Sequence, residues 1–482
     1  MANLYLFAIG GSGSRVLRSL TMLMASGIDT KYNIIPMIID PDVLNGDLLR
    51  TVSLLRLYEK IHNSLVFDNS LKNKFFKTSI TSLNNDGSYM LPLAGTSGIS
   101  FDRFISLGTM SQNNQALTKM LFSNKNLSST MDVGFKGNPN IGSVVLNQFT
   151  QSDLFRTFET NFVEGDRVFI ISSIFGGTGA SGFPLLLKKM RTSSNTALAN
   201  APIGAVSLLP YFNLGSNNTS SIAADSFITK TKAALNYYER NVTGNGTLND
   251  MYYLGDDFSA YCYNNCDGGG GQKNDAHIIE VLAALSIIDF EKKQMGERIE
   301  TQFHEFGLEK SIEANNAVIF SDFGSNTKEI IMRPLSMMSL LNSYLNNRDK
   351  KHRVSQQWAI ERNSILGGNF FDGSFFQDYL NFKKDFEKWQ SELANNKIGF
   401  KPFNEDKDKV VQKEDGLCKV AGVNPKYNGI PGPWRKKGYD LIDQRLSENM
   451  AKVPHNLSAA VTFMDLFYIT LAGICSKNLK IN

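Results

Sequence analysis

Three short runs of mostly apolar residues predict strands that are buried on both faces of a parallel sheet. They are Leu4 to Ile9, Asn33 to Ile39 and Val168 to Ile171. The first run ends in a glycine-rich turn, and apolar residues then recur at helical spacing from Val16 to Met24. A strand, a helix and a second strand form a βαβ unit, so the chain is predicted to open as an α/β protein.

The later part of the chain alternates strand and helix signals and then becomes largely helical. The predicted elements are a strand at Ile203 to Leu209, helices at Ser226 to Tyr238 and Asp275 to Phe290, a short strand at Val318 to Phe320, and a C-terminal helix at Ala459 to Ile474. The last segment is shorter than the roughly 18 to 20 residues that a membrane span needs, and it contains Asp465. We therefore predict a buried helix and no membrane span.

Composition narrows the class of protein. The 482 residues are 42% hydrophobic, which excludes whole-chain disorder. The net charge of +4 is too small to argue for binding to nucleic acid. The basic run Arg348 to Arg353 is expected to be a solvated loop. An adaptor protein is a possible partner, and nucleic acid would be contacted only indirectly if at all. Four cysteines do not make a disulfide framework, and Cys262 and Cys266 do not predict a zinc site. The first residues carry no basic segment, and a cytoplasmic protein is expected.

Two glycine-rich turns each follow a buried strand and precede a helix. They are Gly10 to Ser14 and Gly176 to Gly182. Glycines let backbone N–H groups approach an anion, and the positive end of the following helix favours phosphate. Both turns are expected at the carboxyl edge of one sheet, where open α/β sheets bind their ligands.

Neither of the two best-known phosphate motifs is present. The chain has no Gly-x-x-x-x-Gly-Lys-Ser/Thr segment, and Val16 replaces the third glycine of a dinucleotide motif that would start at Gly11. Asp40 does follow the second strand, where a ribose-binding acid would lie. An NAD(P)-dependent oxidoreductase therefore stays open as the weakest alternative, although it leaves the second turn unexplained.

The second turn, Phe175 to Gly182, resembles the GGTG signature of the tubulin/FtsZ superfamily. Gly10 to Ser14 resembles that family's first phosphate loop, and Asp40-Pro41-Asp42 its acidic second loop. The resemblance covers roughly residues 4 to 330 and is nearest to the divergent bacterial tubulin-like proteins. It implies an α/β nucleotide-binding domain with a parallel sheet, a central helix and a smaller second domain with a helical C-terminal extension.

The resemblance implies phosphate-binding roles for both turns and for two further loops. The first turn would wrap the α- and β-phosphates and the second would clamp the phosphate chain. An acidic loop would face Mg²⁺ or the ribose, and a third glycine loop would sense the γ-phosphate. In that order the residues are Gly10, Gly11, Ser12, Gly13 and Ser14; Gly176, Gly177, Thr178 and Gly179; Asp40 or Asp42; and Gly95, in the loop that ends at Gly98.

Guanine recognition and hydrolysis are implied in the same way. Asn236 matches the first base-contacting position, while Asn274, Asp275 and His277 compete for the second. Tubulin-like GTPases hydrolyse GTP with an acid supplied by the next subunit, and Asp322 is the candidate for that acid. Its rival is Asp289, inside the long helical pattern.

These features together predict three parts and one leading function. The parts are a GTP-binding domain at 1–274, a central helix at 275–295, and a second domain with a helical extension at 296–482. The expected function is a GTP-binding protein that needs Mg²⁺, assembles head-to-tail with copies of itself into filaments, and hydrolyses GTP to GDP and phosphate at the subunit junction. The main alternative is a switch or scaffold component that binds GTP without polymerising.

Overall fold

The structure is a computed structural model of the chain. It describes residues 1–482 except 85–86, 94, 97, 132–133, 136, 212, 215–225, 245, 257–261, 264–268, 295–299, 306–316, 405–418, 421–437, 480 and 482.

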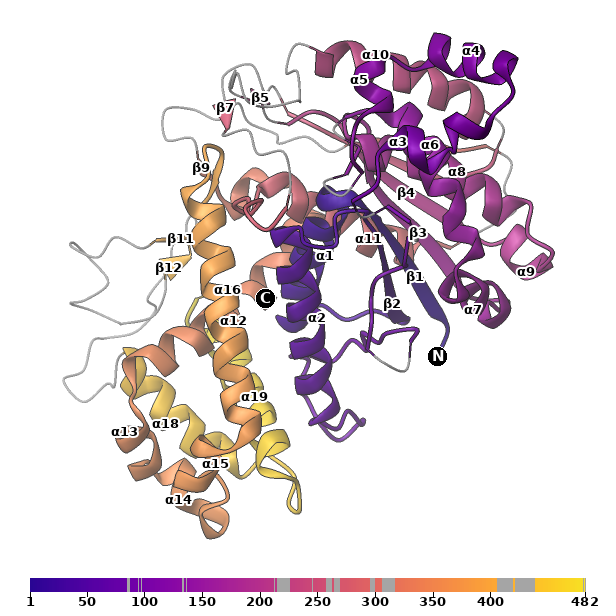
Figure 1. The fold of residues 1–482 in the computed structure, drawn as a ribbon. Coiled ribbons are helices and arrows are strands. Elements are labelled where there is room, and N and C mark those ends of the chain that lie inside the picture. Colours follow the sequence, from indigo (N-terminus) through magenta and orange to yellow (C-terminus); the bar gives the residue numbers. More distant parts are fainter. Residues whose placement is uncertain are drawn as a thin grey trace.

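A six-stranded sheet forms the centre of the larger part of the molecule (Figure 1). Its strand order is β2-β1-β3-β4-β6-β8, and every neighbouring pair is parallel. The strands are β1 (Asn3–Ile9), β2 (Asn33–Ile39), β3 (Arg167–Ser173), β4 (Ile203–Leu208), β6 (Asp250–Leu254) and β8 (Gln302–Glu305). Because all strands run the same way, the turns that follow them lie at one edge, the carboxyl edge. The predicted mixed α/β fold with a parallel sheet is confirmed.

Helices cover both faces of this sheet. Alternate residues of β1 divide between two apolar clusters, with Leu6 in one and Phe7 in the other. The Leu6 cluster includes α1 (Gly10–Ala25), α2 (Gly46–Asn63) and α11 (Ile278–Lys292). The Phe7 cluster includes α6 (Pro139–Leu146), α7 (Asp153–Asn161), α8 (Gly177–Arg191) and α10 (Ser226–Tyr238).

The smaller elements lie around this sheet. They are α3 (Phe101–Phe104), α4 (Gln112–Leu121), α5 (Asn124–Leu127), α9 (Thr196–Ala199), β5 (Asn213–Leu214) and β7 (Cys262–Tyr263). Isolated parallel bridges join Ile80 to Ile34 and Met90 to Ile38, so the segment between Ile80 and Met90 follows the outer edge of β2.

The C-terminal part is a helical body that packs against α1 and α2 (Figure 1). Its elements are β9 (Ala317–Val318), η5 (Phe320–Asp322), α12 (Ser325–Asn347), α13 (Lys350–Ser355), α14 (Gln357–Ser364), α15 (Gly368–Asp372), α16 (Ser374–Asn395), β10 (Gly399–Phe400), β11 (Phe403–Asn404), β12 (Lys419–Val420), α18 (Gly438–Met450) and α19 (Ala459–Lys477). One apolar cluster runs from the Leu6 face of the sheet into this body without a break. Burial of apolar surface therefore joins the two parts.

Helix α19 is the only helix among the described residues that is long and apolar enough to cross a membrane. In the structure, 67% of its most apolar window is buried, and its residues pack in the core of the helical body. The carboxylate of Asp465 accepts hydrogen bonds from the backbone N–H groups of Lys72 and Asn73, at 2.7 and 2.8 Å. The one acid within this apolar helix thus has partners inside the protein.

Candidate functional site

The two glycine turns lie against each other at the carboxyl edge of the sheet. Gly10 has a φ of +75°, a conformation that favours glycine, and a Cβ there would lie 3.4 Å from Cβ of Thr178. Gly177 is equally constrained, because a Cβ at that position would lie 2.9 Å from Cβ of Phe135. Two turns that are about 165 positions apart in the chain therefore form one structural unit.

Helices α1 and α8 begin directly in these turns, and neither is capped. Neither the residue before α1 (Ile9) nor the residue before α8 (Gly176) makes a side-chain capping bond, and neither first turn contains an acid. The first four N–H groups of a helix have no partner within the helix, and they form the positive end of its dipole. Two such ends side by side make a site for an anion.

The hydroxyl groups of the turns are placed differently. The hydroxyl of Ser14 is fully buried and donates to the carbonyl of Gly10 at 3.4 Å, within its own helix. Ser12 is partly exposed in the first turn of α1. Ser181 donates to the carbonyl of Gly177 at 2.6 Å, which fixes the first turn of α8.

A segment that the sequence analysis did not single out covers the second turn. Around Gly177, the backbone nitrogens of Asn138 and Gly137 lie 3.1 and 3.2 Å from a Cβ built on that glycine. We call the described residues Gly134, Phe135, Gly137 and Asn138 the strap. The strap leads directly into α6, whose first residue is Pro139 and whose N-terminus also has no side-chain cap.

The loop of Gly95 is the segment that the sequence predicts as the sensor of the γ-phosphate. Gly95 itself is exposed, and no described heavy atom lies within 4 Å of a Cβ built on it. Its role as a γ-phosphate sensor stays a prediction that no contact supports. The signal that could have identified the strap was local: Gly134 and Gly137 both precede an Asn-Pro step that starts a helix.

The acidic loop after β2 lies beside the first turn. An oxygen of Asp40 accepts from the backbone N–H of Asp42 at 3.0 Å, and an oxygen of Asp42 accepts from the N–H of Gly269 at 2.7 Å. Both carboxylates are buried, and burial together with the charge of Asp42 raises the pKa of Asp40 to about 7. Two carboxylates beside a phosphate turn are the donors that Mg²⁺ takes in proteins, with phosphate oxygens and water completing its shell.

Helix α2 begins at the same edge, but it is fully capped. The side chain of Asn45 accepts from the N–H groups of Asp47 and Leu48, at 2.9 and 3.2 Å. Its amide also donates to the side chain of Gln272 at 2.5 Å. Asp47 places an acid in the first turn of α2. This helix end is therefore satisfied within the protein and does not favour a phosphate.

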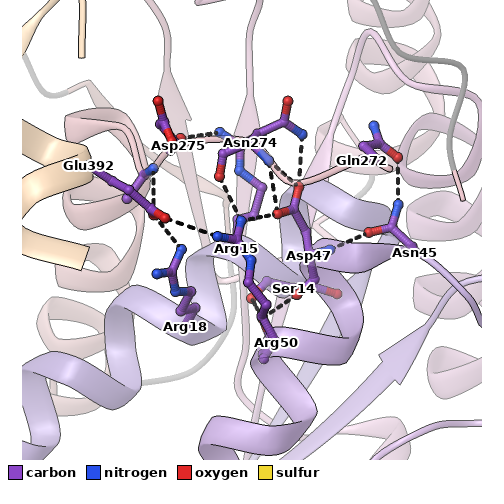
Figure 2. Close-up of polar contacts among 12 residues, drawn as sticks. Ser14, Arg15, Arg18, Asn45, Asp47, Arg50, Gln272, Asn274, Asp275 and Glu392 are labelled. Carbon is purple, nitrogen blue, oxygen red and sulfur yellow. Dashed lines mark hydrogen bonds and ion pairs between the residues drawn. The ribbon is translucent and has the colours of Figure 1, made fainter. Parts of the chain in front are cut away.

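Asn274, one of the three candidates for the guanine contact, is held by α2 (Figure 2). Its side-chain amide donates to Asp47 at 2.8 Å, and its backbone N–H donates to the same carboxylate at 3.1 Å. Arg50 donates to the Asn274 carbonyl at 2.7 Å and also pairs with Asp47. Asn274 is thus positioned by hydrogen bonds to an ion pair, and its side-chain oxygen has no hydrogen bond to the described residues.

The other two candidates have different surroundings. His277 caps α11: its Nδ1 accepts from the N–H of Ile279 at 3.1 Å, while Glu280 accepts from the N–H of His277 at 3.2 Å. Burial, followed by the charge of Arg15, lowers the pKa of His277 to about 3, so its ring is neutral. His277 is therefore a structural cap, whereas Asp275 is exposed next to it. Arg15 pairs with Glu280 and donates to the Asp275 carbonyl at 3.4 Å.

One carboxylate from the helical body joins this network. Glu392 of α16 is 7% exposed, and it accepts from Arg18 at 2.7 Å, Arg50 at 3.0 Å and the N–H of Ala276 at 3.2 Å (Figure 2). Arg18 belongs to α1, Arg50 to α2, and Ala276 precedes α11. Glu392 therefore ties the helical body to the three elements that surround the turns.

Asn236, the first guanine candidate, is exposed on α10, the helix that covers the opposite face from α11. Asn236 and Asn274 therefore belong to helices on opposite faces of the sheet. No bond among the described residues links Asn236 to the glycine turns, and its role stays a prediction.

The two candidate catalytic acids lie at opposite ends of α11. The carboxylate of Asp322 accepts a hydrogen bond from the N–H of Ile319 at 2.8 Å. Ile319 directly follows β9, and β9 pairs with β10. β10 follows Asn396, which donates to the carbonyl of Ala276 at the start of α11. Asp289 lies in the last turn but one of α11, at the amino edge of the sheet, and its side chain is 47% exposed. It accepts from the hydroxyl of Tyr252 at 2.6 Å.

The basic run is not a solvated loop, which corrects the sequence-based expectation. Residues 350–355 form α13, and Arg348 pairs with Asp440 and with Asp443, the latter at 3.2 Å. The guanidinium of Arg353 lies 4.8 Å from the ring centroid of Phe371. These cations are used inside the helical body, so they do not form a free basic surface.

Two parts of the chain remain to be considered as metal sites: the segment with the two cysteines and the acidic loop after β2. Among the described residues, no group of three His, Cys, Asp or Glu side chains is placed to hold a metal ion. Cys266 and Gly268 lie outside the described residues, and His277 is committed to its cap. A Mg²⁺ ion at Asp40 and Asp42 would consequently depend on phosphate oxygens for much of its shell.

Comparisons with known proteins find likenesses among solved structures only. No family model matches the chain, and no curated protein matches it. Among solved structures, CetZ from Methanosaeta thermophila strain DSM 6194 has a TM-score of 0.31 at 13% identity, and the match covers 60% of this chain and 54% of that one. CetZ2 from Haloferax volcanii, a GTPγS-bound protofilament, scores 0.28 at 11% identity, with 60% and 58% covered.

CetZ1 from Haloferax volcanii, a GDP-bound monomer, scores 0.27 at 12% identity, with 53% and 51% covered. The chain thus spans little more than half the length of these structures. Likenesses at this level carry no argument, and the function has to be argued from the chain's own contacts.

Proposed function

We propose that this chain is a tubulin-like protein that binds a guanine nucleotide, with the phosphates at the starts of α1 and α8. The observation that carries the proposal is the contact between two uncapped, acid-free helix starts at Gly10 and Thr178. Backbone N–H groups of both turns would bind the phosphate oxygens, and the two helix dipoles would stabilise their charge. This is also what the resemblance of both turns to the tubulin/FtsZ signatures implies.

The base would lie on the α11 side of the turns. Asn274 and Asp275 supply an amide and a carboxylate there, and guanine presents N1–H and a 2-amino donor beside the O6 acceptor. The backbone of Asn274 is fixed by Arg50 and Asp47, so its side chain is held in place before a ligand arrives. Asp40 and Asp42 would hold Mg²⁺, which would supply positive charge to the phosphates.

Self-assembly is the second half of the proposal. A head-to-tail neighbour would place its opposite end over the nucleotide, so the acid that completes the site has to lie at the end away from the turns. Asp322 lies at the same end as its own turns, whereas Asp289 lies at the other end and is half-exposed. For hydrolysis in trans this arrangement therefore favours Asp289 over Asp322 as the acid.

The experiment is right-angle light scattering of the purified protein with GTP, GDP and NADH, with phosphate release followed in parallel. A GTP-specific rise with phosphate release is expected for a polymerising GTPase. Asp289→Asn should then abolish phosphate release and spare nucleotide binding, with Asp322→Asn as the matched comparison. A variant that loses release only at Asp322 would restore the sequence-based assignment.

Two other outcomes have defined meanings. Thermal stabilisation by GTP without scattering would identify the non-polymerising switch, for which the link of Glu392 to α1 and α2 offers a route to the helical body. Stabilisation by NADH and not by GTP would overturn the proposal in favour of an oxidoreductase.

A further inference from the structure

Lys230 of α10 reaches the strap from the side. Its ammonium group donates to the carbonyl of Gly137 at 2.9 Å, and a Cβ built on Gly137 would lie 3.3 Å from Nζ. Gly137 in turn lies against Gly177 at the start of α8. Gly137 therefore lies between the ammonium of Lys230 and the turn that is proposed to clamp the phosphates.

This ammonium is only partly solvated, and no carboxylate of the described residues pairs with it. Among the described residues, no Asp or Glu oxygen lies within 4 Å of Nζ of Lys230. Other partly buried lysines are paired: Lys383 with Glu387 at 2.9 Å and Lys293 with Asp250 at 2.6 Å. Partial burial also lowers the pKa of Lys230. A cation in this position gains most from an anion that arrives as a ligand.

We propose that Lys230 is a specificity-determining residue that pairs with the terminal phosphate of the bound nucleotide and makes the site prefer a triphosphate to a diphosphate. This inference rests on the proposed function and adds a side-chain cation to a site otherwise built from backbone N–H groups. The α1 turn contacts the α8 turn at Thr178, while the strap and Lys230 lie beyond Gly177. A phosphate chain held between the turns would meet Lys230 only at the end that reaches the strap.

The test compares two lysines on the same helix. Lys230→Met and Lys232→Met remove the same charge, but Lys232 is exposed and makes no hydrogen bond to the described residues of the strap. Affinities for GTP, GDP and GMP are measured by calorimetry on the full chain. Lys230→Met should weaken GTP binding about 10- to 100-fold, as expected for the loss of a charge-assisted hydrogen bond, and should weaken GDP binding clearly less. Lys232→Met should change none of them, and Lys230→Arg should retain most of the GTP preference.

Equal losses for all three nucleotides, or no loss, would overturn the role of Lys230. A wild-type chain that binds no guanine nucleotide would instead overturn the proposed function. In that case inorganic tripolyphosphate and pyrophosphate serve as probes in thermal shift assays, because they require no base contact. A tripolyphosphate shift that Lys230→Met removes would support the inference, and a shift that persists in the variant would overturn it.

Discussion

Two pairs of helices begin at the same edge of the sheet, and they differ in whether their first turns are capped. The pairs are α1 with α8 and α2 with α11. The first pair has neither a side-chain cap nor an acid in its first turn. The second pair is capped by Asn45 and His277 and carries Asp47 and Glu280 in its first turns. A cap contributes roughly 1 kcal/mol to stability, so its absence at two adjacent helix starts marks the place where the N–H groups are left for a ligand. The capped pair does not form a second phosphate site, and it instead holds the side-chain amides of Asn45 and Asn274 in place.

The largest expected effect comes from giving α1 the acid that it lacks. Ser12→Asp places a carboxylate in the first turn, beside the proposed phosphates. At about 4 Å and an effective dielectric of about 20 the repulsion is on the order of 4 kcal/mol, which is roughly a thousandfold in affinity. The same change should leave the melting temperature unchanged or raise it, because the carboxylate complements the helix dipole. Calorimetry with GTP and a thermal melt measure both quantities.

Ser325→Asp is the matched control, because Ser325 is an exposed first residue of α12, another helix without a cap or an acid in its first turn. It should leave GTP affinity unchanged. If Ser12→Asp binds GTP as tightly as the wild type does, the contrast between the two kinds of helix start has no functional meaning.

The second effect is a pH dependence that Asp40 introduces. Its pKa is about 7 in the folded chain, against about 3.9 in an unfolded one, so the folded state holds the extra proton between these values. Stability from this group is present below pH 4 and is lost as the pH rises through 7. The loss is on the order of 4 kcal/mol, and Asp40→Asn should remove it. Urea unfolding of both proteins from pH 4 to 8 gives the difference directly.

The titration of His277 changes the free energy of unfolding in the opposite direction to that of Asp40. The wild-type curve alone therefore does not isolate Asp40, and the comparison with Asp40→Asn is needed. Its pKa of about 3 in the folded chain lies below the usual value of about 6.5, so its contribution is present above pH 6.5 and is lost as the pH falls towards 3. The wild-type curve therefore contains two opposing slopes. A difference curve that is flat from pH 4 to 8 would show that Asp40 titrates normally.

The third effect concerns the capped pair and its link to the helical body. Glu392→Gln leaves Arg18 and Arg50 without their shared carboxylate and should lower the free energy of unfolding by about 3 kcal/mol. Glu387→Gln, five residues earlier on the same helix and paired only with Lys383 in the ion-pair network, should cost less than about 1 kcal/mol. Urea unfolding measures both, and equal losses would show that the Glu392 network is not special.

The smallest effect tests which amide contacts guanine. Asn274→Ala should lower the preference for GTP over ATP by about fivefold, since one amide hydrogen bond contributes about 1 kcal/mol. Asn236→Ala should leave the preference unchanged, because Asn236 is exposed on α10. Competition binding with the two nucleotides checks this, and the reverse result would move the base to the α10 side of the turns.

The local parts of the fold could be predicted from the sequence. Continuous apolar runs marked β1, β2 and β3, and the glycines that follow Ile9 and Ile174 marked the starts of α1 and α8. These features could be predicted because strand burial and helix starts depend on neighbouring residues. The helix at Ser226–Tyr238 also lies where the spacing placed it.

The contacts between distant segments could not be predicted in this way. Glu392 pairs with Arg18 across 374 positions, and nothing near either residue indicates the other. The strap contacts Gly177 only because α6 and α8 pack together on the same face of the sheet. His277 caps α11 by accepting from the N–H of Ile279, and its role as a base contact stays a prediction. Each of these depends on tertiary packing, which periodicity does not encode.

The strand order also has a consequence for how the chain folds as it is made. β1 occupies the interior of the sheet between β2 and β3, but its β3 partner begins at Arg167. At 5 to 20 residues per second, a ribosome needs on the order of 8 to 32 s to deliver that partner after β1 has emerged. Both glycine turns are complete once residue 182 is made, whereas Glu392 follows some 210 residues later, on the order of another 10 to 40 s. The two glycine turns are therefore complete before the helical body exists, and the ion pairs of Glu392 close late in synthesis.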